Sequence, residues 1–317
     1  MTMRLTRTLC LSATLAVLAG TALAQELPNE GPVPTTALIS VESKNPVQLD
    51  PQALSLQVNG HNTPINSLHA VSSGNVEIAI LIDDGLRTSF SQQIREISTF
   101  INSQPPNAKV LVGYMQNGTV RSSGHFSADH QEIADQLRIT TSVPGSSASP
   151  YFCLSDFAKH WPSQEPAARF VLMLTNGVDP YNGAPTISNQ TSPYVDAAQS
   201  DAQRAGIAVY SIYFPDSGFR GGRGSFSGQS YLQQVGDATG GTLFNIGSIP
   251  PVSIGPFLQQ FGSAINSSYE LGFLANTGSK RDTLTPIRVK SKQPGVKIHA
   301  PQSVRPGLTE SAVERGD

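Results

Sequence analysis

The sequence of 317 residues is poor in cysteine and in charge. It contains two cysteines, Cys10 and Cys153, and charged residues make up only 14% of the chain. Cys10 lies at the front of the apolar stretch of a predicted leader, so after processing Cys153 has no partner for an internal disulfide. Because Cys153 is next to Tyr151, Phe152 and Leu154, we expect its side chain to be buried as a small apolar group. The alternative is that Cys153 is a reactive thiol.

Long apolar runs and an excess of basic residues are also missing. Beyond the leader, no apolar run reaches half of the roughly 20 residues that a membrane-spanning helix needs. The formal net charge is −2, and nucleic acids or anionic lipids normally select a strongly basic surface. We therefore expect no membrane span and no nucleic-acid partner.

Residues 1–24 have the three features of an export signal. Arg4 and Arg7 form a positive front, a short apolar stretch follows, and Ala22-Leu23-Ala24 is a small-x-small cleavage site. We expect an exported protein, either periplasmic or secreted. Removal of the two arginines with the leader makes the remaining chain more acidic.

The middle of the chain alternates apolar strands with amphipathic helices. Residues 76–82 and 168–175 are almost wholly apolar, which is typical of parallel strands covered by helices on both faces. Further strands are predicted at 207–214 and 242–246, with helices between them. This alternation of strands and helices predicts an α/β fold of Rossmann-like type, with three layers and a mostly parallel central sheet.

Short β segments flank this region on both sides, and we expect them to meet as one small sheet. The predicted organisation is a signal peptide (1–24), an N-terminal β segment (25–72), an α/β domain (73–268), a C-terminal β segment (269–306) and a disordered tail (307–317).

Three local patterns add detail to this prediction. Asn59-Gly60 and Asn117-Gly118 are typical of tight β-hairpins. Ser89 and Gln92 have the spacing of a capping box at the start of the first helix. The glycine-rich residues 217–228, which include Arg220 and Arg223, are expected to form a mobile loop and not a nucleic-acid-binding tract.

The sequence lacks the common catalytic motifs. Neither a G-x-G-x-x-G nor a G-x-x-x-x-G-K-[ST] run follows a predicted strand, and no serine lies in a G-x-S-x-G elbow. The six histidines are scattered, without the i, i+4 pair of a zinc-binding helix. These absences weigh against nucleotide-binding, hydrolase and zinc-enzyme functions, and we expect no catalytic residues.

Several segments, taken in order, resemble a von Willebrand factor type A (VWA) domain, and more narrowly the VWFA-related domain of exported acidobacterial proteins. The resemblance is carried by the strand ending at Asp83, the Asn117-Gly118 hairpin, Phe170-Val171-Leu172-Met173-Leu174-Thr175-Asn176-Gly177, Ala205-Gly206-Ile207-Ala208-Val209-Tyr210, Gly240-Gly241-Thr242-Leu243-Phe244 and Tyr269-Glu270-Leu271-Gly272-Phe273. It implies the α/β fold described above and a protein-binding function.

The resemblance also implies a metal-ion-dependent adhesion site (MIDAS) at the top of the sheet. Such a site holds Mg²⁺ with an Asp-x-Ser-x-Ser loop, a threonine and a later aspartate. The corresponding positions here are Asp83, Gly85, Arg87, either Ser146 or Ser147, and Asn176.

Two hydroxyl ligands and one carboxylate are therefore missing, and Arg87 brings a positive charge. We expect a degenerate MIDAS without a metal ion, and no other cofactor, in which Arg87 pairs with Asp83. The alternative is that Arg87 lies on the solvent face of the helix start. Asp84 and Asp179 flank the same rim, either as turn-forming acids or as ligands of an irregular Ca²⁺ site.

The predicted function is that of a non-enzymatic binding or adhesion module that docks a protein or cell-surface component. The residues expected to contact the partner are Asp83, Asp84, Arg87, Asn176 and Asp179. Two alternatives stay open: a hydrolase or phosphoryl-transfer enzyme that uses Asp83 and Asp84, and a structural component of an envelope assembly that makes contact through its β element.

Isothermal titration with Mg²⁺ and Mn²⁺ tests the metal-free prediction. We expect no binding in the micromolar range, because a fixed guanidinium next to a divalent cation is unfavourable. A Gly85→Ser, Arg87→Ser double variant should move the site towards binding. Micromolar binding by the unaltered chain would contradict the prediction.

Overall fold

The computed structural model describes residues 31–45, 47–143, 145–182, 191–215, 223–244, 247, 249–276 and 283–308. The predicted signal peptide and residues 309–317 of the predicted tail lie outside these ranges. No helix within the described ranges is both long enough and apolar enough to cross a membrane.

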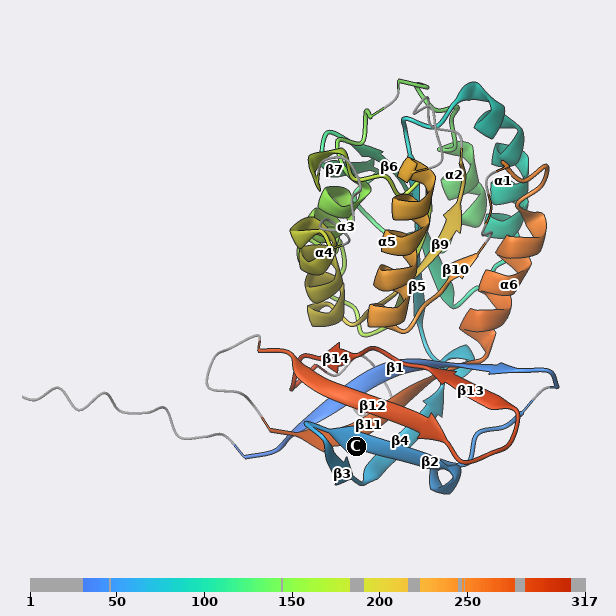
Figure 1. Cartoon of the computed structure of the whole chain (residues 1–317). Coiled ribbons are helices and arrows are strands. Elements are labelled where there is room, and N and C mark those ends of the chain that lie inside the picture. The colour runs from blue at the N-terminus through green and yellow to red at the C-terminus, as the bar shows by residue number, and fades with distance from the viewer. Residues whose placement is uncertain are drawn as a thin grey trace, which may run out of the picture.

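The described chain contains strands, α-helices and short 3-10 helices (η) with these bounds: β1 Val33–Ser43, η1 Pro51–Ala53, β2 Leu54–Val58, β3 His61–Thr63, β4 Ile65–Ala70, η2 Val71–Ser73, β5 Val76–Asp83, η3 Thr88–Gln93, α1 Ile94–Asn102, β6 Ala108–Gln116, β7 Thr119–Ser122, α2 His130–Asp135, α3 Pro150–Lys159, β8 Ala168–Thr175, η4 Pro180–Asn182, α4 Pro193–Arg204, β9 Ile207–Tyr213, α5 Arg223–Thr239, β10 Leu243–Phe244, α6 Gly255–Asn266, β11 Ser268–Ala275, β12 Thr285–Ser291, β13 Val296–His299 and β14 Ser303–Val304. Figure 1 shows an α/β part above a part made of strands.

The α/β part is built on a six-stranded sheet of order β10-β9-β8-β5-β6-β7. Its strands run parallel except β7, which pairs antiparallel with β6. The predicted Rossmann-like fold with a mostly parallel sheet is confirmed. Since β5 is an interior strand of the sheet, its carboxyl end lies near the middle of the edge formed by the carboxyl ends of the parallel strands.

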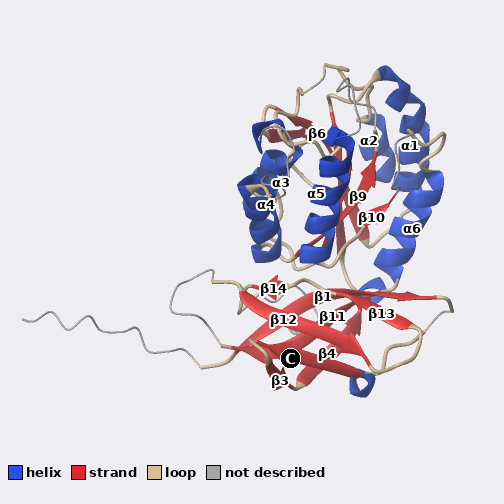
Figure 2. Ribbon diagram, in the orientation of Figure 1, coloured by secondary structure: helices blue, strands red, loops and turns tan. Residues whose placement is uncertain are grey.

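Helices cover both faces of this sheet (Figure 2). Successive side chains of its strands are buried in two separate apolar clusters. On β5, Ile78, Ile80 and Ile82 pack in the cluster that contains α1, α2 and α6. Ala79 and Leu81, which point to the other face, pack with α3, α4 and α5. All eight residues of β5 are buried, which explains why its sequence is apolar without alternation apart from Glu77 and Asp83.

The N- and C-terminal strands form a second, all-β part. The single small sheet predicted from the sequence is in fact two four-stranded sheets, β13-β1-β11-β4 and β14-β12-β2-β3. Each sheet has one apolar face, and the two faces share one core that includes Ile39, Leu56, Phe273 and Val289. Two sheets arise because an apolar face left in water would be unfavourable, and each sheet covers the other.

Both predicted Asn-Gly hairpins are present. Asn59 and Gly60 have φ angles of 51° and 79°, and Asn117 and Gly118 have φ angles of 48° and 78°. Two successive positive φ angles are the signature of the type I′ turn, which matches the twist of the strands it joins. The turns connect β2 to β3 and β6 to β7.

The start of the first helix differs from the prediction. Residues 88–93 form the 3-10 helix η3, and α1 begins only at Ile94, so Ser89 and Gln92 do not cap it. Gln93 is buried, and its side-chain oxygen accepts a hydrogen bond of 3.1 Å from the backbone N–H of Ile254. A tertiary contact, and not the local capping pattern, therefore fixes this segment.

Half of the glycine-rich segment is also more ordered than predicted. Residues 223–228 lie in α5, while residues 217–222 fall outside the described ranges. Gly228 lets α5 approach the loop after β8: a Cβ atom at this position would lie 2.3 Å from the carbonyl oxygen of Asn176. The glycine is needed for close packing beside the predicted site.

A matched pair of glycine substitutions tests this packing. Gly228→Ala should lower the free energy of unfolding by about 1–3 kcal/mol, because the backbone of Asn176 leaves no room for a methyl group. Gly262→Ala in α6, where the nearest atom to the new Cβ is 3.6 Å away, should raise it by up to about 1 kcal/mol. Urea unfolding measures both; destabilisation of the same size in both variants would contradict the explanation.

Candidate functional site

Asp83 ends β5 at the carboxyl edge of the sheet, where open α/β folds place their ligand sites. Its carboxylate is only 2% exposed. One oxygen accepts a hydrogen bond from the backbone N–H of Gly85 at 3.0 Å, and the other accepts one from the Thr175 hydroxyl at 2.8 Å. The Ser147 hydroxyl is a third donor.

Burial raises the pKa of Asp83, although the hydrogen bonds from Thr175, Gly85 and Ser147 partly oppose this shift. Cys153 lies nearby and is fully buried, as predicted, with its thiol donating to the carbonyl oxygen of Ser147 at 3.4 Å. Burial raises the pKa of this thiol to about 12. Cys153 is therefore a packing residue behind the site and not a reactive thiol.

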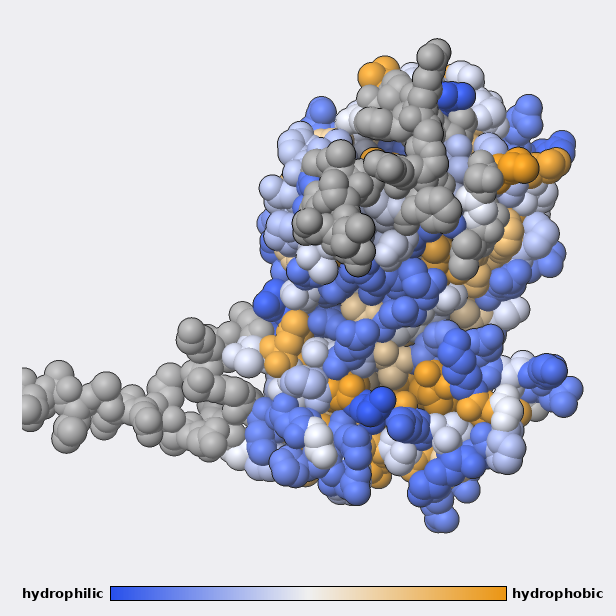
Figure 3. All heavy atoms as spheres, viewed as in Figure 1, coloured by the Kyte–Doolittle hydropathy of each residue, from blue (hydrophilic) through white to orange (hydrophobic). Residues whose placement is uncertain are grey.

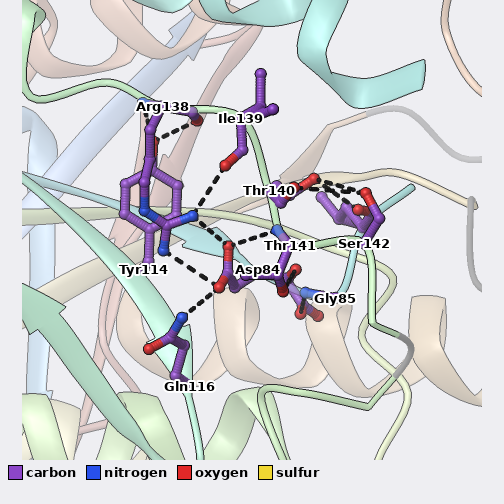
Figure 4. Close-up of polar contacts among 11 residues, drawn as sticks. Asp84, Gly85, Tyr114, Gln116, Arg138, Ile139, Thr140, Thr141 and Ser142 are labelled. Carbon is purple, nitrogen blue, oxygen red and sulfur yellow. Dashed lines mark hydrogen bonds and ion pairs between the residues drawn. The ribbon is translucent and has the colours of Figure 1, made fainter. Parts of the chain in front are cut away.

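Asp84, the next residue, is completely buried and surrounded by donors (Figure 4). The guanidinium of Arg138 forms a bidentate ion pair with it, at 2.7 Å and 3.2 Å. The Gln116 side-chain amide and the backbone N–H of Thr141 also donate to this carboxylate. Burial would raise the pKa of Asp84, but these hydrogen bonds together hold it below the usual value.

Arg138 is itself fixed on two sides. Its guanidinium lies 3.8 Å from the centre of the Tyr114 ring, which is a cation–π arrangement. The Tyr114 hydroxyl donates to the backbone carbonyl of Arg138 at 2.7 Å and accepts from its N–H at 2.6 Å. Thr141 and Ser142 add bonds to the backbone carbonyl of Asp84, so the loop of residues 138–142 is tied across the ends of β5 and β6.

The expected pair of Asp83 and Arg87 is not formed. Arg87 lies exposed at the start of η3, which matches the alternative from the sequence analysis. An arginine does form an ion pair with an aspartate at this edge, but the two residues are Arg138 and Asp84 and not Arg87 and Asp83. The sequence did not reveal it because the two residues are 54 positions apart.

The remaining predicted site residues make local contacts. Asn176 follows Thr175 and accepts a hydrogen bond from the N–H of Val178 at 2.8 Å. Asp179 is buried, and it accepts from the N–H of Tyr181 at 3.2 Å and from the hydroxyl of Ser192 at 2.8 Å.

Ser192 in turn caps α4, so Asp179 fixes the start of that helix. Of the two serine candidates, Ser147 is the one that bonds to Asp83, whereas the Ser146 hydroxyl is buried and has no partner in the described part of the chain.

This donor set does not fit a divalent cation. Both oxygens of Asp83 accept protein hydrogen bonds, and Asp84 is neutralised by Arg138. A Cβ atom on Gly85 would lie 3.0 Å from the carbonyl oxygen of Val143, so a serine there has to displace the loop, and the Gly85→Ser, Arg87→Ser variant is not expected to gain a metal site by these two changes alone. Within the described ranges, no group of three His, Cys, Asp or Glu side chains has metal-binding geometry.

Exposed apolar side chains gather on the loops around this edge. Of the large apolar residues that the described chain exposes, the loops at the carboxyl edge carry Ile139, Val143, Tyr181, Ile249 and Val252. The other one, Leu274, lies on β11 in the all-β part. Figure 3 shows orange atoms at the end of the molecule opposite the all-β part. These five side chains lie at separate places around the edge; we call them together the apolar rim, and they were not predicted from the sequence.

No protein-family model and no curated protein sequence matches the chain. Solved structures with a similar fold include an aerotolerance-related membrane protein from Bacteroides fragilis NCTC 9343, with 16% identity over 61% of this chain and 99% of that chain and a TM-score of 0.43. The manganese-loaded TRAP protein of Plasmodium vivax has 12% identity over 74% of this chain and 95% of that chain, with a TM-score of 0.40. The VWA domain of SpRpn10 has 9% identity over 59% and 95%, with a TM-score of 0.37.

The six-stranded, mostly parallel sheet with helices on both faces is the fold that the sequence resemblance implied. At these identities and TM-scores the likeness concerns the fold alone. The site must be interpreted from its own geometry.

The neighbours Asp83 and Asp84 should respond in opposite ways to neutralisation. Asp84→Asn should lower the free energy of unfolding at pH 7 by about 1–3 kcal/mol, because Arg138 loses a charged partner. A lowered carboxyl pKa stabilises the fold above the unfolded pKa of about 4, so this loss should shrink as the pH falls below that value.

Asp83→Asn should keep or raise the free energy of unfolding at pH 7, because the amide removes a buried charge. The raised pKa means that the wild type loses stability as the pH rises through the folded-state pKa, so the variant's advantage should vanish near pH 4. Urea titrations between pH 3 and pH 8 measure both variants. Equal losses at neutral pH would contradict the assigned environments.

Proposed function

We propose that this chain is an exported, non-enzymatic binding module that docks a protein or cell-surface partner through the apolar rim, without a divalent cation. The observation that carries the proposal is the gathering of exposed apolar side chains on the carboxyl-edge loops. A partner that covers these side chains removes their apolar surface from water, which favours binding. The fold similarities are consistent with a binding function but do not identify a partner.

The burial of the acids changes which residues would touch the partner. Asp83, Asp84 and Asp179 were expected at the contact, yet their carboxylates lie inside the protein and bond to its own groups. We assign these three residues to holding the loops in place. Ile139 and Val143, together with exposed Arg87, are the side chains that face outward.

An enzyme that uses Asp83 and Asp84 is less well supported. A catalytic carboxylate has to come within hydrogen-bond reach of a substrate. Asp84 has no exposed surface and is held by a bidentate ion pair, and Asp83 is bonded through both oxygens. Neither group can meet a substrate unless the loop of residues 138–142 first leaves its place.

The rim can be tested against a matched apolar position elsewhere. The double variant Ile139→Ser, Val143→Ser should reduce the amount of partner that cross-links to the chain in an envelope extract by about tenfold, since both side chains lose apolar contact area. Leu274→Ser, which removes an exposed apolar side chain from β11, should leave the yield unchanged. EDTA should have no effect on either yield.

Two results would contradict this proposal. Loss of cross-linking in EDTA would show that a metal ion takes part. Loss with Leu274→Ser but not with the rim variant would favour the alternative of an envelope component that makes contact through its β part. Circular dichroism of each variant shows whether the fold is intact.

A further inference from the structure

A large cleft lies where the α/β part meets the all-β part, away from the apolar rim. Residues of α6, β10, β1 and β13 line it, and its volume is about 1160 Å³. In Figure 1, α6 descends onto β1 and β13 at this junction. Since pockets for single small molecules measure roughly 300–1,000 Å³, this cleft is suited to a segment of a longer chain.

Two buried aromatic rings and several hydrogen bonds support the inner side of the cleft. The Tyr210 and Phe244 rings are stacked, with centroids 5.9 Å apart and an interplanar angle of 15°. The Tyr210 hydroxyl donates to the Ser40 hydroxyl at 3.2 Å, and the N–H of Val41 donates to the carbonyl oxygen of Ser267 at 3.1 Å. These bonds join the two parts of the molecule, so the cleft is already formed in the free protein.

One wall carries side-chain amides. Gln259, Gln260 and Asn266 project from α6 and are exposed. Each amide offers an acceptor oxygen and two donor hydrogens. Because a peptide group also presents one donor and one acceptor, this wall is chemically suited to a polypeptide backbone.

The cleft also lies between the terminal strands of two sheets. β10 is the last strand of the six-stranded sheet, and β13 is the last strand of its four-stranded sheet. Thr242, Leu243 and Phe244 line one side of the cleft, and Lys297 and His299 line the other. A terminal strand offers backbone groups on its outer side, and an extended peptide can pair with them as an additional strand.

The charged side chains of the cleft favour an acidic ligand. Lys297 and His299 both contact the same carboxylate oxygen of Glu42, at 3.2 Å and 2.7 Å. Lys44 adds a further exposed positive charge. The cleft lining thus carries one acid, two lysines and a histidine, although the chain as a whole carries a net charge of −2.

We propose that this cleft binds an extended polypeptide segment of a partner protein that carries acidic side chains. The peptide backbone pairs with the edge of β10 or β13 and with the amides of α6. Its apolar side chains lie against Pro256 and Ala264 of α6, and its carboxylates meet Lys44 and Lys297. This site is separate from the apolar rim and does not depend on the function proposed for it.

Fluorescence anisotropy with the full chain tests the proposal. The probe is a short labelled peptide of alternating valine and glutamate, compared with the same peptide carrying lysine in place of glutamate. The glutamate peptide should bind and the lysine peptide should not. Lys297→Glu should weaken binding by about tenfold, as expected for reversal of one contacting charge. Lys290→Glu, which reverses an exposed lysine on β12 outside the cleft, should leave binding unchanged.

Two further measurements locate the contact on the unaltered chain. Hydrogen exchange should slow at residues 242–244 or 296–299 when the glutamate peptide is added, because new ladder bonds protect amides. The same peptide with alternate backbone nitrogens methylated should bind at least about tenfold more weakly, since it cannot complete the ladder.

Each remaining outcome would overturn the proposal. These outcomes are absence of binding by the glutamate peptide at millimolar concentration, equal binding by the lysine peptide, and protection confined to residues outside the cleft. Binding of an N-acetylglucosamine hexamer that displaces the peptide and is unaffected by Lys297→Glu would instead identify a glycan site.

Discussion

The loops at the carboxyl edge depend on the ion pair between Asp84 and Arg138. A completely buried carboxylate is unfavourable unless charged or polar donors surround it. Arg138 meets this need with two hydrogen bonds, and Tyr114 holds the guanidinium from behind. The loop of residues 138–142 must therefore lie across the strand ends, and it closes the position where a VWA resemblance would place a cation.

This arrangement determines which side chains are exposed to solvent at the carboxyl edge of the sheet. Arg138 directs its guanidinium to Asp84 while 42% of its side chain stays exposed, whereas the next residue, Ile139, points its side chain away from the cluster (Figure 4). Asp83 and Asp179 are likewise satisfied inside the protein, by Thr175 and by Ser192. An edge that might have been acidic becomes one with exposed apolar side chains.

The all-β part also has a role beyond covering the lower end of the sheet. Ser40 pairs in register with Ser268 on one side and with His299 on the other, which brings β1 and β13, far apart in the sequence, to the strand that follows α6. The cleft exists only because these distant segments meet. The two candidate surfaces thus have different origins: the rim arises from loops of the α/β part, and the cleft from its junction with the strands.

Local patterns in the sequence determined the fold class, the buried parallel strands, the two Asn-Gly turns and the burial of Cys153. These features follow from side-chain periodicity and turn chemistry, which act over a few residues. Tertiary structure decided the rest. It moved the start of α1 to Ile94, extended α5 to Arg223, divided the terminal strands into two sheets and gave Asp84 a partner in Arg138 instead of leaving Asp83 to Arg87. Each of these outcomes depends on contacts between residues far apart in the chain. The energies of these contacts exceed local conformational preferences, and the sequence next to each residue does not indicate its distant partner.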